Sequence, residues 1–349
     1  MLQKIPVKVN TPEWLELRRS YIGCSDIPIL TGSNRNYGSP LDIFYDKIGL
    51  EIKKFKMSER PLMGHIQEPT ILNLWRYSDG KEWVDNYTNG RVLREFKQNT
   101  GYIVVNPEIP FMSDTPDGTI EKGTLNLFGE KLDKDAPLQA KNIDSLKWAS
   151  SDGWIPEHKE QVTGEMLVFG TQYSETVSLI GGNQLVVAQV EYNEDVAAAI
   201  YNICKNFWIN CVQPAKPLAK QFLLAYSKAE KEAIMKDIMA LEPLPDDSDA
   251  YRDFLSTRFK NQDNPEKKVK ASPDMEVLMN YYQFYNDIGK EVDLIKRKIK
   301  NTLLRYHEHN AVTLIQGEGC KSTMNKNHLV KGREISTKHI KDQLNKLKP

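Results

Sequence analysis

The stretch from Ser113 to Lys141 constrains this chain more than any other part of it. It reads SDTPDGTIEKG, then a variable insertion, and then the short run APLQAKNI. A Pro-Asp-Gly turn is thus followed by a predicted strand in which Gln139 and Lys141 are two residues apart. Because residues i and i+2 of a strand point to the same face, we expect both side chains to face one cleft. Leu138 and Ala140 would then pack behind them.

Gln139 is the unusual residue of this pattern. With a carboxylate at position 139, that residue and Asp117 would hold a hard divalent cation, and Lys141 would lie beside an attacking water. A purely structural role is the alternative, because Pro-Asp-Gly is a common turn and a polar-apolar-Lys strand is ordinary at a half-buried edge of a sheet. Other motifs in the chain are needed to decide between the two.

Length and charge limit the alternatives without choosing a function. The 349 residues fit one large domain with an appendage, or two domains. Lys plus Arg and Asp plus Glu both number 47, so net charge does not indicate a nucleic-acid partner. The balance is uneven, with 20 basic and 12 acidic residues from position 251 onward. An acidic body with a basic tail fits carboxylates at a metal site and phosphate contacts elsewhere, and equally fits solvated helix faces.

The expected compartment follows from the cysteines and from hydropathy. Cys24, Cys204, Cys211 and Cys320 lack metal-ligand spacing, which is typical of reduced thiols. The N-terminal MLQKIPVKVNT lacks the apolar region of a signal peptide, and no run approaches the ~20 apolar residues of a membrane span. We therefore expect a soluble, cytoplasmic protein with no membrane partner.

Two predicted helices near the N-terminus place Arg18 close to Ser25. Pro12 at the first helical position opens the first helix and Gly23 ends it, while Ser25 and the following Asp cap the next. Guanidinium donors, a hydroxyl group and a free helix N-terminus would form a pocket for phosphate. A surface Arg beside a routine N-cap is the alternative.

A further acidic candidate, Glu68, lies on the long predicted helix MGHIQEPTILNLWRYSDG. It is about one turn from His65 and either contributes to a metal site or faces solvent. The predicted buried side of this helix consists of Ile66, Ile71, Leu72, Leu74 and Trp75.

The remaining order of elements predicts the fold class. Strands are expected for GRVLREF, GYIVVNPEIPFM, TLNLFGE and LQAKNI, and a hairpin for TVSLIGGNQLVVAQVEYN. A helix from about Pro156 carries Gln161 and Glu165, and EDVAAAIYNICKNFWINCV is a long amphipathic helix. This order predicts an α/β or α+β core with a central mixed β-sheet flanked by helices.

Pro214 and Pro217 mark a predicted domain boundary, which divides the chain into residues 1–217 and 218–349. The second part combines a helix, an acidic loop PLPDDSDAYRD, a small hairpin at AVTLIQGEGCKSTMNKN and a basic tail. Apolar residues at alternating steps of three and four predict a helical hairpin or a coiled-coil arm. They are Leu278, Tyr281, Tyr285, Ile288, Val292, Ile295 and Ile299.

Five motifs in a fixed order carry a family resemblance: WLELRRSYIGCSD, MGHIQEP, FMSDTPDG, the LQAK strand and EHKEQVTGEMLVFG. Together they resemble the lambda-exonuclease/YqaJ family of phage recombination nucleases, a branch of the PD-(D/E)xK superfamily, over roughly residues 10 to 217. The resemblance implies a restriction-endonuclease-like core that digests double-stranded DNA ends 5′ to 3′ with Mg²⁺ or Mn²⁺. It also implies a homo-oligomer, with a ring trimer as one arrangement, and a single-strand annealing protein as partner.

The resemblance assigns roles position by position. Arg18 and Ser25 match the pocket for the 5′-phosphate of the DNA end. The positions that match metal-binding and catalytic residues are Glu68, Asp117 (with Thr115 where the motif has Ser), Gln139 in place of the metal-binding Glu, the catalytic Lys141, and Gln161 on the following helix.

The departure at Gln139 leaves three explanations open, because an amide keeps the shape of a carboxylate and loses its charge. The change is engineered to trap uncut substrate, or the chain is a homologue with lost or weakened catalysis, or the acidic ligand has migrated. Candidates for a migrated ligand are Asp114, Asp133, Asp135 and Asp144. A non-catalytic DNA-end or protein-binding homologue and a related endonuclease are the alternative functions.

Overall fold

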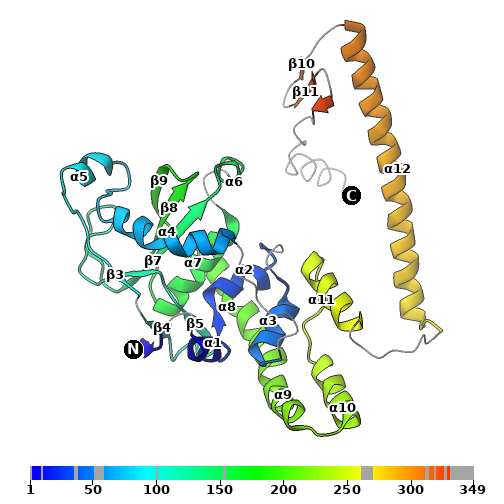
Figure 1. Cartoon of the computed structure of the whole chain (residues 1–349), viewed down its shortest axis with the longest axis horizontal. Coiled ribbons are helices and arrows are strands. Elements are labelled where there is room, and N and C mark those ends of the chain that lie inside the picture. Colours follow the sequence, from blue (N-terminus) through cyan, green and yellow to red (C-terminus); the bar gives the residue numbers. More distant parts are fainter. Residues whose placement is uncertain are drawn as a thin grey trace. The chain divides into compact units, whose positions relative to one another are not determined.

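The chain forms two compact units in a computed structural model, Met1–Gln262 and Asp263–Pro349 (Figure 1). The structure describes residues 2–8, 11–34, 38–50, 59–99, 101–151, 155–260, 270–310, 314–317, 320–325 and 328–330. The boundary predicted at residue 217 lies inside the first unit. Helix continues through both prolines, because the π-helical turn Trp208–Val212 leads directly into α9 (Gln213–Leu224).

The first unit opens with mostly helical elements. In chain order these are β1 (Gln3–Pro6), α1 (Pro12–Arg18), β2 (Ile22–Gly23), the 3₁₀ turn η1 (Cys24–Asp26), α2 (Ile27–Leu30), α3 (Pro40–Lys47), α4 (Glu59–Trp75) and α5 (Val84–Thr88). The N-caps follow the sequence signals. Thr11 accepts a hydrogen bond from the Trp14 N–H, and Ser39 accepts one from the Asp42 N–H.

Strands then alternate with helices. The elements are β3 (Lys97–Gln98), β4 (Tyr102–Val105), β5 (Met112–Asp114), β6 (Gly118–Ile120), β7 (Ala136–Ile143), α6 (Ser145–Ala149), α7 (Pro156–Phe169), β8 (Glu175–Ile180), β9 (Gln184–Gln189), α8 (Glu194–Phe207), α9, α10 (Lys228–Met239) and α11 (Asp249–Lys260). The predicted hairpin is confirmed as β8 and β9, which pair antiparallel around two glycines with positive φ.

The strands of the first unit form two mixed sheets, in the orders β1-β4-β5-β2 and β3-β6-β7-β8-β9. Parallel pairs join β2 to β5 and β7 to β8, and the other pairs are antiparallel. The predicted mixed α/β class with flanking helices is confirmed. Two sheets take the place of the single central sheet that we expected.

Strand β7 lies in the middle of the five-stranded sheet, between β6 and β8. Leu138 and Ala140 pack in a hydrophobic cluster with α4, as the strand alternation predicts. The residues that α4 contributes to this cluster are Ile71, Leu72 and Trp75. Lys141, on the other face of β7, contacts α7. The polar face of β7 is therefore turned toward α7.

One residue of α4 departs from its predicted burial. Ile66 is 60% exposed, although we expected it on the buried side. It precedes Trp75 by nine residues, which is a half-turn offset at about 100° per residue, so the two side chains point to opposite sides of the helix. Glu68 precedes Leu72 by four residues and shares the buried face instead.

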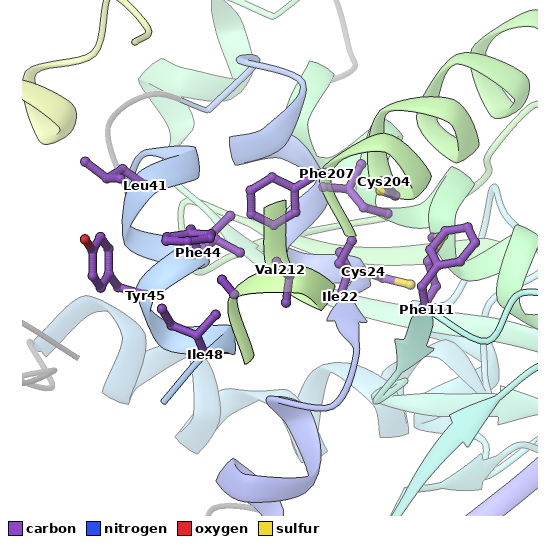
Figure 2. Packing of buried hydrophobic residues seen from close by; sticks show 14 of the residues in the cluster. Ile22, Cys24, Leu41, Phe44, Tyr45, Ile48, Phe111, Cys204, Phe207 and Val212 are labelled. Atoms are coloured by element: carbon purple, nitrogen blue, oxygen red, sulfur yellow. The ribbon is translucent and has the colours of Figure 1, made fainter. Parts of the chain in front are cut away.

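The largest core joins the N-terminal helices to α8 and α9, and Figure 2 shows Phe44 of α3 and Ile48, which directly follows α3, beside Val212 and Phe207. Ile22 and Cys24 lie next to Phe111 in the same view. The core also includes Ala215, Ala219, Ile238, Tyr251 and Phe254, all beyond or close to the predicted boundary. This packing explains why the first unit extends past residue 217.

Three local predictions were wrong. The segment GRVLREF is not a strand, and only Lys97–Gln98 pairs after it. TLNLFGE forms a turn with one isolated bridge between Leu125 and Lys131. The acidic loop turns into α11, where Tyr251 is buried and Arg258 pairs with Glu242, so tertiary contacts stabilise a helix that its composition disfavours.

The second unit contains α12 (Pro273–Asn310) and an antiparallel sheet of β10 (Leu314–Gly317), β11 (Cys320–Asn325) and β12 (His328–Val330). α12 is one continuous helix (Figure 1), so of the two forms predicted here it is an arm and not a helical hairpin. The terminal hairpin has a third strand. The predicted basic tail lies outside the described residues. Among the described helices none has the length and apolar character needed to cross a lipid bilayer.

Candidate active site

Asp117 lies in the turn between β5 and β6, next to the middle of β7. Its Oδ2 accepts a hydrogen bond from the Ala140 N–H at 2.8 Å. The β6–β7 ladder begins at the pair Gly118 and Leu138, so Ala140 lies just beyond it and its N–H is available to a side chain. This bond places the carboxylate of Asp117 beside the strand that carries Gln139 and Lys141.

Lys141 is connected to α7 by a chain of hydrogen bonds. Its Nζ donates to Gln161 Oε1 at 3.1 Å, and Gln161 Nε2 donates to Glu165 Oε1 at 2.9 Å. Gln161 and Glu165 are four residues apart and therefore lie one above the other on the same helix face. Lys141, Gln161 and Glu165 thus form one hydrogen-bonded chain between β7 and α7.

Glu68 completes an electrostatic cluster with Asp117 and Lys141. Burial raises the pKa of Glu68, and the positive charge of Lys141 opposes this rise. Burial, together with the charge of Glu68, raises the pKa of Asp117 to about 7, again against the effect of Lys141. His65 lies with Nδ1 3.8 Å from Glu68 Oε2. The structure thus brings Glu68, Asp117 and Lys141 into one neighbourhood.

Two buried acids extend this cluster beyond the residues that the family resemblance assigned. Asp114 ends β5, and burial together with the charge of Asp117 raises its pKa to about 7. Burial and the charge of Asp114 raise the pKa of Glu165 well above its ordinary value. Glu165 could have been found in the sequence, because it follows Gln161 by one helical turn. Nothing in the local sequence distinguishes Asp114 from other aspartates at strand ends.

Three oxygens of this cluster are buried without a hydrogen-bond partner: Asp114 Oδ2, Gln139 Oε1 and Glu165 Oε2. Their residues are 3%, 6% and 0% exposed. A buried polar atom without a partner costs roughly 1–3 kcal/mol, so native proteins rarely keep several together unless a ligand satisfies them. Carboxylate and amide oxygens are the donors that Mg²⁺ and Mn²⁺ prefer, and the residues present fit such an ion.

The site is not a preassembled carboxylate cage. Within the described ranges, no three His, Cys, Asp or Glu side chains gather closely enough to hold a metal by themselves. The amide of Gln139 would have to be one of the donors. The metal-ligand set predicted from sequence, Asp117, Gln139 and Glu68, has this mixed composition.

The other three candidates for a migrated acidic ligand are Asp133, Asp135 and Asp144, and each lies in a different setting. Asp144 caps α6 by accepting from two backbone N–H groups. Asp135 accepts from the Lys122 N–H and lies 3.8 Å from Lys4 Nζ. Asp133 lines a separate cavity of about 460 Å³ beside the end of α7. Of the four, Asp114 belongs to the cluster around Lys141.

His158, in the first turn of α7, was not among the predicted site residues. Burial, followed by the positive charges of Lys141 and Lys147, lowers its pKa to about 3. The imidazole is therefore neutral at physiological pH and can accept a hydrogen bond on the α7 side of Lys141.

Arg18 and Ser25 are in direct contact, as predicted. Arg18 Nη2 donates to Ser25 Oγ at 2.9 Å, and the guanidinium lies over the Trp14 ring at 4.7 Å. The expected free helix N-terminus is absent from this pair, because the Asp26 carboxylate accepts the Gly23 N–H and α2 has only four residues. β2 follows Arg18 and pairs with β5, which ends in an acid of the cluster described above.

The fold is a mixed α/β fold with helices around two mixed sheets. No protein-family model matches the chain. The chain is similar to the uncharacterized protein YqaJ of Bacillus subtilis (strain 168), with 27% identity over 207 residues, or 58% of this chain. The matched part spans 56% of that relative's length.

Solved structures with some likeness include an alkaline exonuclease (LHK-Exo) from Laribacter hongkongensis, alone and in complex with dAMP. Each gives a TM-score of 0.41 and 14% identity, covering 66% of this chain and 100% of that one. SSO0001 gives a TM-score of 0.28 and 12% identity over 66% of this chain and 97% of that one.

Proposed function

We propose that this chain is a metal-dependent deoxyribonuclease that resects double-stranded DNA ends from 5′ to 3′. The observation that carries the proposal is the cluster around Asp117 and Lys141, in which Asp114, Gln139 and Glu165 each keep one buried oxygen without a hydrogen-bond partner. The ordered motifs and the sequence similarity to YqaJ support it. A homo-oligomer, a single-strand annealing partner and a cytoplasmic location remain predictions of the same resemblance.

Asp117, Gln139 and Asp114 would hold Mg²⁺ or Mn²⁺, with Glu68 as a further carboxylate beside them. A bound ion of this kind polarises the scissile phosphate and lowers the pKa of a coordinated water. Gln161 holds the ammonium group of Lys141 in place, and Glu165 holds Gln161. Lys141 then orients the attacking water and offsets negative charge that develops on the phosphate.

Asp114 would supply the negative charge that is lost with a glutamine at position 139. The amide of Gln139 supplies an oxygen without charge. The missing charge is available on Asp114, which is buried, has one oxygen without a hydrogen-bond partner, and interacts electrostatically with Asp117. Of the three explanations for Gln139, we thus propose the migrated ligand. The chain would then cleave DNA without a glutamate at position 139.

Cleavage of linear duplex DNA with Mg²⁺ by the unmodified chain and three variants tests this proposal. We expect the unmodified chain to digest linear DNA, and Lys141→Ala to slow it by ~100-fold or more because transition-state charge is no longer offset. Asp114→Asn should be nearly as damaging, whereas Asp135→Asn, outside the cluster, should leave the rate unchanged.

Other outcomes would change the assignment. An inactive chain that gains strong activity with Gln139→Glu would identify a disabled exonuclease and exclude Asp114 as the substitute ligand. If neither the unmodified chain nor Gln139→Glu cuts DNA, the chain is a non-catalytic binder of DNA ends or protein. Cutting of closed circular DNA would identify an endonuclease.

Arg18 and Ser25 would bind the 5′-phosphate of the DNA end. Arg18→Ala should slow digestion of 5′-phosphorylated ends by roughly tenfold more than digestion of 5′-hydroxyl ends, since a charge-assisted contact is lost only with phosphate present. Arg252→Ala, an exposed arginine on α11, is the matched control. Equal slowing of both substrates would contradict the pocket assignment.

A further inference from the structure

α12 presents an apolar seam that the described residues leave uncovered. The helix runs for 38 residues, which corresponds to about 57 Å at 1.5 Å per residue. Seven side chains recur along it at steps of three and four, and each is exposed, from 42% at Ile288 to 65% at Tyr285. They are Leu278, Tyr281, Tyr285, Ile288, Val292, Ile295 and Ile299. An exposed apolar seam of this length on one helix face is typical of a surface that packs against another helix.

The spacing defines heptad positions. The a positions are Leu278, Tyr285, Val292 and Ile299, and the d positions are Tyr281, Ile288 and Ile295. This a/d pattern holds for three heptads, which is the length at which it indicates a coiled coil and not a chance stripe. The register thus predicts which side chains would meet across a helix pair.

Charges beside the seam favour a second copy of the same chain in parallel orientation. Glu291 is a g residue, and in a parallel pair it faces the e residue five positions later, which is Lys296. The other three g–e pairs are Val277 with Tyr282, Phe284 with Gly289, and Lys298 with Leu303. No pair of this kind opposes like charges. In an antiparallel pair g faces g and e faces e, so the contact between Glu291 and Lys296 would be lost.

The residues at d also bear on the number of copies. Ile288 and Ile295 are β-branched at d, which disfavours two-stranded parallel packing and favours three or four strands. Tyr282 at e, together with Val277 and Phe284 at g, widens the apolar face, and all three are exposed. A wider face fits a helix that contacts two neighbours.

We propose that α12 joins copies of this chain through a parallel, in-register coiled coil of three or more strands. This inference is independent of the proposed nuclease activity, since it uses only residues of α12. It names the surface by which the predicted homo-oligomer would assemble, and it requires no contact between the first units.

Size measurement of the full-length chain by multi-angle light scattering tests the proposal. We expect a mass of at least three chains, and expect Ile288→Glu with Ile295→Glu to reduce it to one chain. Lys290→Glu with Arg297→Glu, two f positions on the outer face, should leave the mass unchanged. Circular dichroism checks that both double variants keep their helix. A monomeric unmodified chain, or a mass that Ile288→Glu with Ile295→Glu does not alter, would overturn the proposal.

Cross-linking distinguishes the parallel, in-register coiled coil from other occupants of the seam. In a background with Cys211→Ser and Cys320→Ser, copper-phenanthroline should join chains that carry Ile288→Cys, since d positions meet in a parallel coil. Lys290→Cys at f should not be joined. Joining of both variants alike, or of neither, would show that something other than an in-register copy covers the seam.

Discussion

Buried carboxylates on the two sides of β7 differ in how completely their oxygens are hydrogen-bonded. On the α4 side, Glu175 is fully buried and both of its oxygens have partners. Arg94 Nη1 donates to them at 2.7 and 2.8 Å, Trp75 Nε1 donates at 2.7 Å, and the Tyr173 hydroxyl also donates. On the α7 side, Asp114 and Glu165 are just as buried, but each keeps one oxygen without a partner.

The difference separates a structural acid from acids available to a ligand. The charge of Glu175 is compensated within the fold, so this network stabilises the contact between α4 and β8. Asp114 and Glu165 lie beside other negatively charged groups and a single positive charge, that of Lys141. Burial raises the pKa of both carboxyl groups. Such an arrangement is costly in the isolated protein and becomes favourable only with a cation or proton bound.

The largest effect on stability is expected at the compensated site. Glu175→Ala leaves Arg94 buried and unpaired, which should lower the free energy of unfolding by about 3–5 kcal/mol. Urea unfolding measures the change. Glu95→Ala is the matched control, since Glu95 pairs with Arg76 at the surface and should cost less than about 1 kcal/mol. Equal costs for the two variants would mean that the Glu175 network does not stabilise the fold.

Replacement of the uncompensated acid Asp114 is expected to raise the free energy of unfolding, not to lower it. The folded pKa of Asp114 is about 7 against 3.8 ordinarily, so its contribution to stability is present at low pH and is lost as pH rises from about 4 to 7. Without divalent metal, Asp114→Asn should therefore raise the free energy of unfolding at pH 8 by on the order of 3 kcal/mol.

This gain should vanish near pH 4, where the native carboxyl group is protonated as well. Unfolding in EDTA at several pH values measures it, and Asp135→Asn, at a half-exposed ion pair, should change stability by less than about 0.5 kcal/mol. A loss of stability in Asp114→Asn at pH 8 would place Asp114 with Glu175 among the structural acids.

A smaller effect is expected where α7 packs against the η1–α2 turn. A Cβ on Gly164 would lie 2.0 Å from Ile27 Cδ1, so Gly164→Ala should cost about 1–3 kcal/mol through overpacking. Gly289→Ala in α12 meets no atom within 4 Å and should be neutral or stabilising. Because α7 carries Gln161 and Glu165, we expect Gly164→Ala also to weaken metal binding, measured by calorimetry. Unchanged stability would mean that Ile27 moves aside freely.

Local patterns predicted much of the frame that supports the site. The alternation of β7 placed Leu138 and Ala140 against the core, and Pro12 opened its helix where the structure has it. The contact of Arg18 with a serine seven residues later was also predictable. Each of these depends on residues close in sequence, for which strand period, helix period and capping rules apply directly.

Predictions failed where distant packing outweighed local preference. Residues after Pro217 join the core because Tyr251 and Phe254 are buried there, although the prolines resemble a linker. TLNLFGE has strand composition, but it forms a turn. Composition cannot report which neighbour a segment meets, and that neighbour decided each of these cases.

The sequence alone determined the site strand, with its Gln139 and Lys141 on one face, and the heptad seam of α12. Only the tertiary structure decided that Asp114 and Glu165 share the cluster of Lys141, and that their oxygens lack partners. The reason is physical. Periodicity acts over a few residues, whereas the burial and charge of an acid depend on what the fold packs around it, here α7 against β5 and β7.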